Sequence, residues 1–270
     1  MRISTHDGVS LFVDDAGGTG APVVFQHGLG GDASQTRDVF PASPDLRMFT
    51  VECRCHGRSD PGRPEAFALA TVSDDVAAFV EQNFNKPIVI GGISMGAAIA
   101  LRIAVKSPEL VKGVILGRPA WLHTVAPPNL SPIRLVADLV VRHGPERARE
   151  VFERSSVVRE LAVAAPDNLE SLRGYFRRPD IALFSRMLAA IAGDGPNVTE
   201  TELAAIGVPT LVVGTADDLL HPLAFAKALA DVIPYAELRE ITSKVQSRAN
   251  YALEFGEAIR GFIARHHLGE

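Results

Sequence analysis

The feature that most constrains this 270-residue chain is the stretch 87–98, which reads PIVIGGISMGAA. A short β-branched run enters the pattern Gly-x-Ser-x-Gly and continues into an alanine-rich segment typical of a helix. A serine on such a sharp strand-to-helix turn adopts a strained backbone conformation, so small residues must lie two before and two after it. Gly92 and Gly96 meet this need, and the pattern predicts that the Ser94 hydroxyl stands above the sheet beside a helix N-terminus that favours negative charge. The alternative is a glycine-rich turn with an idle serine.

Strands and helices alternate on both sides of this turn. Short apolar runs predict strands at 23–26, 48–52, 111–116, 209–214 and 236–241, and Ala249 to His266 predicts a closing helix. Another helix is expected to start near Thr71, with Ser73 as its N-cap. This alternation predicts an α/β fold, a doubly wound and mostly parallel sheet with helices on both faces.

The alternation of strands and helices stops between residues 118 and 197, where no strand is expected. Helices are predicted there at 135–141, 148–152, 157–165 and 181–192. We therefore expect a core formed by residues 1–117 and 198–270, with 118–197 inserted as a helical lid over the carboxyl edge of the sheet. The apolar helices of this insert favour a small and largely apolar substrate.

Composition excludes several classes of function. A formal net charge of −5, with no cluster of Lys and Arg, argues against nucleic acid as a partner. No apolar run is long enough for a membrane span, and the first residues lack the apolar core of a signal peptide, so the expected location is cytoplasmic. The two cysteines, Cys53 and Cys55, are expected to be reduced. No residues have the spacing of metal ligands and the phosphate-binding lysine is absent, so we expect no metal or cofactor.

Several motifs, in order, resemble the α/β-hydrolase fold family across essentially the whole chain, and most of all its small bacterial hydrolases with a helical cap. The Gly-x-Ser-x-Gly stretch is similar to the nucleophile elbow of that family, and His27-Gly28 is similar to its His-Gly loop. Residues 52–59 resemble its Arg-Gly-His-Gly-x-Ser loop, with Cys55 in place of the usual glycine. Residues 214–222 resemble the Gly-x-x-Asp stretch that carries the acid of the catalytic triad.

The resemblance implies a set of roles. Ser94 would be the nucleophile, and the backbone amides of Leu29 and Met95 would stabilise the oxyanion. Asp217, three residues after Gly214, would orient the base, although the adjacent Asp218 competes for this role. Some relatives place the acid after the preceding strand, but residues 117–120 contain no carboxylate.

The expected catalytic histidine is missing. The family has it on the loop before the last helix, and here residues 242–254 contain none. Tyr251 is expected to occupy the position where the family has this histidine. A free tyrosine has a pKa of about 10, which suits a hydrogen-bond or proton donor better than a base. His221, four residues after Asp217, is the weaker alternative base, because the family often has a structural His-Pro pair there.

Three other residues are candidates for the substrate pocket. His27 belongs to a loop motif whose imidazole usually braces the backbone in the family. Trp121 begins the insert, where core packing is the competing interpretation, and His123 follows it as a possible substrate contact.

Three functions remain open. The first is a hydrolase of an ester, lactone or related acyl compound that uses Ser94 with an atypical base. The second is a non-hydrolytic enzyme on the same scaffold, such as a lyase or cyclase, and the third is a pseudo-hydrolase that binds a small ligand. The base decides among them, because removing the serine or histidine of a comparable triad costs roughly 10⁶-fold in turnover.

Overall fold

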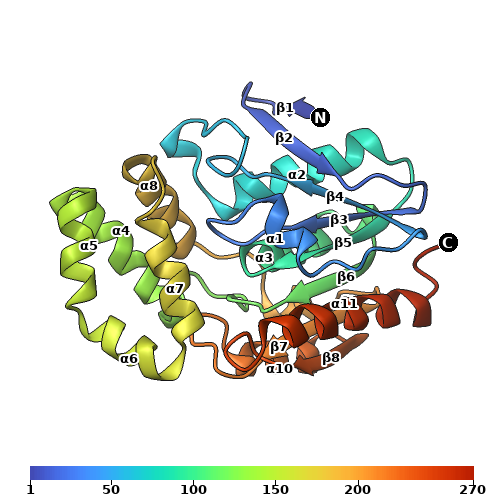
Figure 1. The fold of residues 1–270 in the computed structure, drawn as a ribbon. Coiled ribbons are helices and arrows are strands. Elements are labelled where there is room, and N and C mark those ends of the chain that lie inside the picture. The colour runs from blue at the N-terminus through green and yellow to red at the C-terminus, as the bar shows by residue number, and fades with distance from the viewer.

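The computed structural model describes all of residues 1–270, and its centre is an eight-stranded sheet in the order β1-β2-β4-β3-β5-β6-β7-β8 (Figure 1). The strands are β1 (Arg2–Ser4), β2 (Ser10–Asp15), β3 (Ala21–Gln26), β4 (Leu46–Val51), β5 (Ile88–Ile93), β6 (Val111–Gly117), β7 (Thr210–Thr215) and β8 (Ala236–Ile241). The β1–β2 and β2–β4 pairs are antiparallel, and all the others are parallel. The predicted α/β fold with a mostly parallel, doubly wound sheet is confirmed.

Helices cover both faces of the sheet. They are α1 (Ala33–Arg37), α2 (Leu69–Asn83), α3 (Met95–Lys106), α9 (Glu200–Leu203), α10 (Leu223–Val232) and α11 (Arg248–Arg265). Successive strand residues point to opposite faces, so Val89 packs with α11 on one side while Ile90 packs with α2 and α3 on the other. Burial of alternate residues in this way holds β5, and with it the turn at Ser94, at the centre of the sheet.

Five of the helices between β6 and β7 form one end of the molecule, which we call the cap (Figure 1). They are α4 (Ser131–His143), α5 (Pro145–Glu153), α6 (Ser156–Ala164), α7 (Pro166–Tyr175) and α8 (Ile181–Ala192). Four of them overlap the predicted helices, whereas α7 was not expected. A single hydrophobic cluster runs from the sheet into the cap, joining Val114 of β6 to Leu172 of α7 and Leu188 of α8.

The start of α2 differs from the prediction. The helix begins at Leu69, so Ser73 lies inside it and its hydroxyl donates to the carbonyl of Leu69 at 2.7 Å. Ala68, at the N-cap, offers no side-chain acceptor. Instead the backbone N–H of Leu69 donates to the carboxylate of Asp194, 2.8 Å away at the end of the cap. The acceptor that caps α2 therefore comes from a distant part of the chain.

None of the helices is long and apolar enough to cross a membrane.

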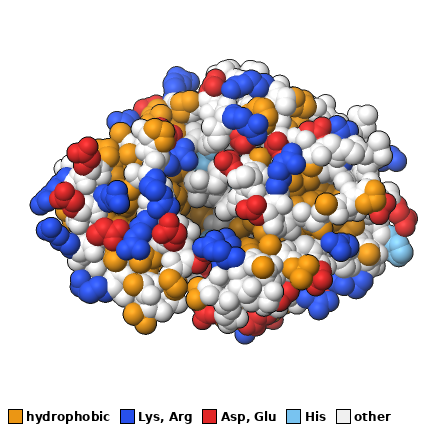
Figure 2. Space-filling model, in the orientation of Figure 1, with side chains coloured by type: hydrophobic (Ala, Val, Ile, Leu, Met, Phe, Trp, Pro, Cys, Tyr) orange, Lys and Arg blue, Asp and Glu red, His pale blue; other side chains and the backbone are white.

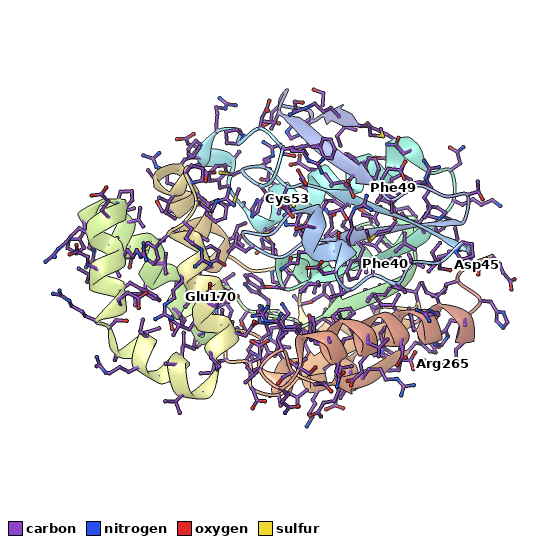
Figure 3. All side chains as sticks on the ribbon, viewed as in Figure 1. Phe40, Asp45, Phe49, Cys53, Glu170 and Arg265 are labelled. Carbon is purple, nitrogen blue, oxygen red and sulfur yellow. The ribbon has the colours of Figure 1, made fainter.

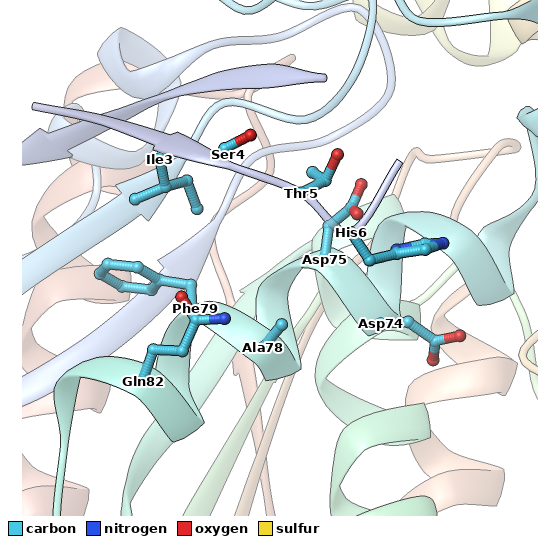
Figure 4. A pocket seen from close by; sticks show the side chains of 9 residues that line it. All are labelled: Ile3, Ser4, Thr5, His6, Asp74, Asp75, Ala78, Phe79 and Gln82. Atoms are coloured by element: carbon cyan, nitrogen blue, oxygen red, sulfur yellow. The ribbon is translucent and has the colours of Figure 1, made fainter. Parts of the chain in front are cut away.

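The strand β1 lies over α2 and leaves a groove of about 170 Å³ between them (Figure 4). Nine residues line this groove: Ile3, Ser4, Thr5, His6, Asp74, Asp75, Ala78, Phe79 and Gln82. Asp75 is the buried carboxylate of this set, and its charge is paired with Arg54 at 2.6 Å.

Candidate active site

Ser94 occupies the turn between β5 and α3 and has the strained conformation that the pattern predicts. Its φ is 57° and its ψ is −110°. A Cβ at Gly92 would lie 2.6 Å from the carbonyl oxygen of Gln26, and one at Gly96 would overlap the same backbone. Only glycines at these two positions let the turn approach β3 so closely. Ser94 remains partly exposed, while the residues around it are buried.

His221 contacts the Ser94 hydroxyl. It lies in the loop between β7 and α10, and its Nε2 is 2.8 Å from Ser94 Oγ. Its Nδ1 lies 2.9 Å and 3.1 Å from the two carboxylate oxygens of Asp218. A carboxylate only accepts hydrogen bonds, so Nδ1 carries the proton and Nε2 is free to accept the serine proton. The three side chains therefore form a chain of hydrogen bonds from carboxylate to imidazole to hydroxyl.

Asp218 is held as a carboxylate by a full set of donors. Arg118 Nε donates to Oδ2 at 2.7 Å and Arg118 Nη2 lies 2.6 Å from the same atom, while Asn168 Nδ2 and the backbone N–H of His221 donate to Oδ1 at 2.9 and 3.0 Å. Burial alone would raise the pKa of this carboxyl, but His221, Arg118 and Asn168 outweigh it and hold the pKa far below its ordinary value. Asp218 is therefore ionised throughout the range in which a protein works.

His221 is held neutral. Burial lowers the pKa of its imidazole, and the positive charges of Arg118 and Lys244 lower it further. Asp218 opposes them, but the pKa stays below the ordinary value for histidine. The Arg118 guanidinium comes as close as 3.2 Å to Nδ1. At neutral pH this imidazole is therefore a proton acceptor toward Ser94.

The carboxylate beside His221 belongs to Asp218 and not to Asp217, which corrects the sequence-based preference. Asp217 has a left-handed backbone, with φ of 55°, and this turns its side chain toward the loop that follows β8. There it accepts hydrogen bonds from Ser243 Oγ at 3.0 Å and from Gln246 Nε2 at 3.3 Å. Asp217 thus ties two loops together.

Tyr251 does not occupy a loop above the sheet. The last helix already begins at Arg248, with Ser247 as its N-cap, so Tyr251 lies in the first turn of α11. Only 2% of the residue is exposed, its ring packs edge-on against Phe255, and its hydroxyl has no hydrogen-bond partner. Burial raises the pKa of this hydroxyl. The expected role of Tyr251 as a proton donor to substrate has no support in this geometry.

Met95 and the loop that contains Leu29 both lie next to Ser94. Met95 is the first residue of α3, where a backbone N–H has no partner within the helix. The loop that contains Leu29 lies against the serine, since a Cβ at Gly28 would be 3.4 Å from Ser94 Cβ. The next two amides in this loop are engaged elsewhere: Gly30 N–H donates to His56 Nε2 at 2.9 Å, and Gly31 N–H to Gly28 O at 3.0 Å.

The three pocket candidates differ in position. His27 is fully buried and braces backbone, because its Nδ1 donates to Gly28 O at 2.8 Å and its Nε2 accepts from Cys53 N at 3.0 Å. Trp121 is also buried, and its indole N–H donates to Asp194 O at 2.9 Å where the two ends of the cap meet. His123 is partly exposed nearby. His27 and Trp121 are therefore structural in this geometry, in contrast to their expected place in the pocket.

Two residues of the site were not expected from the sequence. Arg118 directly follows β6, where the sequence analysis looks only for a carboxylate, and Asn168 lies on the unpredicted helix α7. A signal for α7 does exist, since Ala165-Pro166-Asp167 places proline and an acidic residue in a first helical turn.

No group of three or more His, Cys, Asp or Glu side chains is arranged to hold a metal ion. Figure 2 shows the surface hollowed between the cap and the rest of the molecule.

Comparison with known proteins gives consistent matches. A family model described as the alpha/beta hydrolase fold matches residues 21–243. The AB hydrolase superfamily protein YisY of Bacillus subtilis is 28% identical over 87% of this chain and 88% of its own length. A 2-hydroxy-6-oxononadienedioate/2-hydroxy-6-oxononatrienedioate hydrolase of Pseudomonas sp. is 27% identical over 95% of this chain and 92% of its own. Among solved structures, a thermophilic esterase from Thermogutta terrifontis is similar in fold, with a TM-score of 0.76, 23% identity and 99% of each chain covered.

Proposed function

Because the chain belongs to the α/β-hydrolase fold family, whose relatives include hydrolases, we propose that it cleaves an ester, lactone or related acyl bond through Ser94. One observation carries the proposal: the 2.8 Å hydrogen bond between His221 Nε2 and Ser94 Oγ, with Asp218 behind the imidazole. A ligand-binding pseudo-hydrolase needs no proton acceptor on this hydroxyl, whereas a lyase or cyclase could use the same pair for proton transfer and is separated by the labelling experiment below. The base missing from the last loop is supplied by the loop after β7.

The proposed reaction uses each group at a stated atom. His221 Nε2 takes the Ser94 proton as Oγ attacks the acyl carbon, and the N–H groups of Leu29 and Met95 hold the oxyanion that forms. The imidazolium, stabilised by Asp218, then gives its proton to the leaving oxygen. A water deprotonated by His221 attacks the acyl-enzyme, and the proton returns to Ser94 as the acid is released.

The first experiment tests the nucleophile and the base. We expect a fluorophosphonate probe to label the wild type at Ser94 and p-nitrophenyl esters or lactones to be turned over. Ser94→Ala and His221→Gln should each lower kcat by about 10⁶-fold. Labelling that persists in His221→Gln at the wild-type rate, or turnover equal to that of buffer, would refute the proposal.

A matched pair of variants tests the choice of acid. Asp218→Asn should lower kcat by about 10⁴-fold, because an amide no longer holds the productive tautomer of the imidazole. Asp217→Asn, one residue earlier, should stay within about 10-fold of wild type, since its carboxylate contacts only Ser243 and Gln246. Tyr251→Phe should likewise retain activity, because its hydroxyl makes no hydrogen bond to Ser94, His221 or Asp218. The reverse order of the two aspartates would assign the acid to Asp217.

A further inference from the structure

The cap helix α7 contacts the site from two places on one face. Asn168 and Tyr175 are seven residues apart, so they lie on the same side of the helix about two turns from each other. Both are buried, as are Leu169 and Leu172 between them, whereas Glu170 is exposed on the outer face (Figure 3). At about 1.5 Å of rise per residue, the two contacts are separated by about 10 Å along the helix axis. The buried face of α7 thus reaches two loops that both lie next to Ser94.

The first contact is with the loop that carries the base. Asn168 Oδ1 accepts from the backbone N–H groups of Leu219 and Leu220 at 2.8 and 3.0 Å. Its Nδ2 donates to Asp218 Oδ1 at 2.9 Å. Two backbone donors on one side and a carboxylate on the other leave a single orientation for this amide. Asn168 therefore holds three consecutive residues of the turn between Asp218 and His221.

The second contact is with the loop that carries an oxyanion donor. The Tyr175 hydroxyl donates to the carbonyl oxygen of Leu29 at 3.2 Å. Its ring closes over Gly30, where an added Cβ would come within 2.5 Å of Tyr175 Cε1. The Leu29 carbonyl and the Leu29 N–H belong to successive peptide planes joined at the Leu29 Cα, so the contact limits the rotation of one plane and restrains the loop from which the N–H projects.

We propose that α7 is a strut across the active site, in which Asn168 and Tyr175 are positioning residues for the His221 loop and the Leu29 loop. The inference rests on the proposed function, because it assigns the base and the oxyanion donor as above. Neither side chain is assigned a contact with substrate. Through these two contacts, the position of α7 in the cap affects the rate of the chemical step. Substrate affinity depends on other residues.

The test measures kcat and KM separately on the ester or lactone that the wild type turns over. Tyr175→Phe, which removes only the hydroxyl, should lower kcat by about 10- to 100-fold with KM changed less than about threefold, a smaller loss than removal of a whole oxyanion donor. Asn168→Ala should lower kcat by at least as much and slow fluorophosphonate labelling of Ser94, since the base is displaced. Glu170→Gln, on the outer face of α7, is the matched control and should stay within about twofold of wild type.

A second variant at residue 168 separates positioning from folding. Asn168→Asp keeps an acceptor for Leu219 and Leu220 but places a second carboxylate beside Asp218, which raises the pKa of His221. We expect the acid limb of its kcat/KM profile to move to higher pH. Variants with wild-type kcat and an unmoved profile would overturn the strut, as would losses confined to KM or thermal stability. Turnover by the wild type is measured before any α7 variant. If the wild type turns over no ester or lactone, the proposed function itself fails.

Discussion

Arg118 distinguishes the environment of the His221–Asp218 pair. Its guanidinium is buried, with 7% of the side chain exposed, and it binds the same carboxylate that orients the imidazole. A cation at this position stabilises Asp218 as an anion and also disfavours the imidazolium that forms when His221 takes a proton. Arg118 thus helps to lower the pKa of His221, and it offsets part of the support that Asp218 gives to the charged imidazole.

A pH profile tests this balance. A base with a lowered pKa works down to that pKa and is lost by protonation below it, so the acid limb of wild-type kcat/KM should lie below about pH 6.5, the usual pKa of histidine. Arg118→Met should raise the pKa of His221 and move the limb to higher pH. Arg118→Lys, which keeps the charge, should leave it near the wild-type position. Lys244 is the other cation that faces His221. If the acid limb moves in Lys244→Met but not in Arg118→Met, the lowered pKa of His221 is due to Lys244 and not to Arg118.

At the scale of elements, Asp194 joins the end of the cap to the start of α2. Its carboxylate accepts from Leu69 N at the N-terminus of α2, and its carbonyl accepts from Trp121 Nε1 at 2.9 Å and from Ala126 N at 3.1 Å. An anion at a helix N-terminus also interacts favourably with the helix dipole. This residue therefore caps α2 from a position 125 residues away in sequence.

Removing this cap should lower stability without changing the chemistry. Asp194→Ala should cost about 1 kcal/mol in free energy of unfolding, and thermal denaturation should show a Tm lower by about 2–4 °C. Asp194→Asn, which keeps an acceptor but loses the charge, should cost less. Equal Tm values for Asp194→Ala and the wild type would show that Leu69 finds another acceptor.

These elements also show where prediction from sequence succeeds. The spacing of apolar residues predicts the strands of the sheet, and the glycines around Ser94 predict the turn. Both predictions succeed because strands and turns depend on residues that are close together in sequence. The sequence predicts Ser73 as the N-cap of α2, whereas the acceptor at this helix start is Asp194, which is remote in sequence. Neighbouring residues also do not show which of Asp217 and Asp218 faces His221, because the positive φ of Asp217 and the Asn168 contact from the cap decide it.

At the scale of the whole molecule, the sheet and the cap share one hydrophobic cluster. Val114, Leu172 and Leu188 belong to it, although they come from β6, α7 and α8. The cap is therefore packed on the sheet through apolar contacts as well as through the hydrogen bonds at its two ends.

The single tryptophan makes this testable in one experiment. Trp121 is buried where the chain enters the cap, so its fluorescence reports the cap–sheet junction, whereas far-UV circular dichroism reports all helices and strands. If cap and sheet unfold as one cooperative unit, the two signals should give the same midpoint and slope in urea. An earlier fluorescence transition would mean that the cap separates from the sheet before the sheet unfolds.

Under the proposed function, the spacing of the base and its acid has a consequence for recombination. His221 and Asp218 are three residues apart, so a single exchange of the segment between β7 and α10 would transfer or remove both together. Where the base lies beyond the final strand, by contrast, recombination upstream of it separates the two. In this chain β8 and α11 contribute no side chain to the hydrogen bonds that join Ser94, His221 and Asp218.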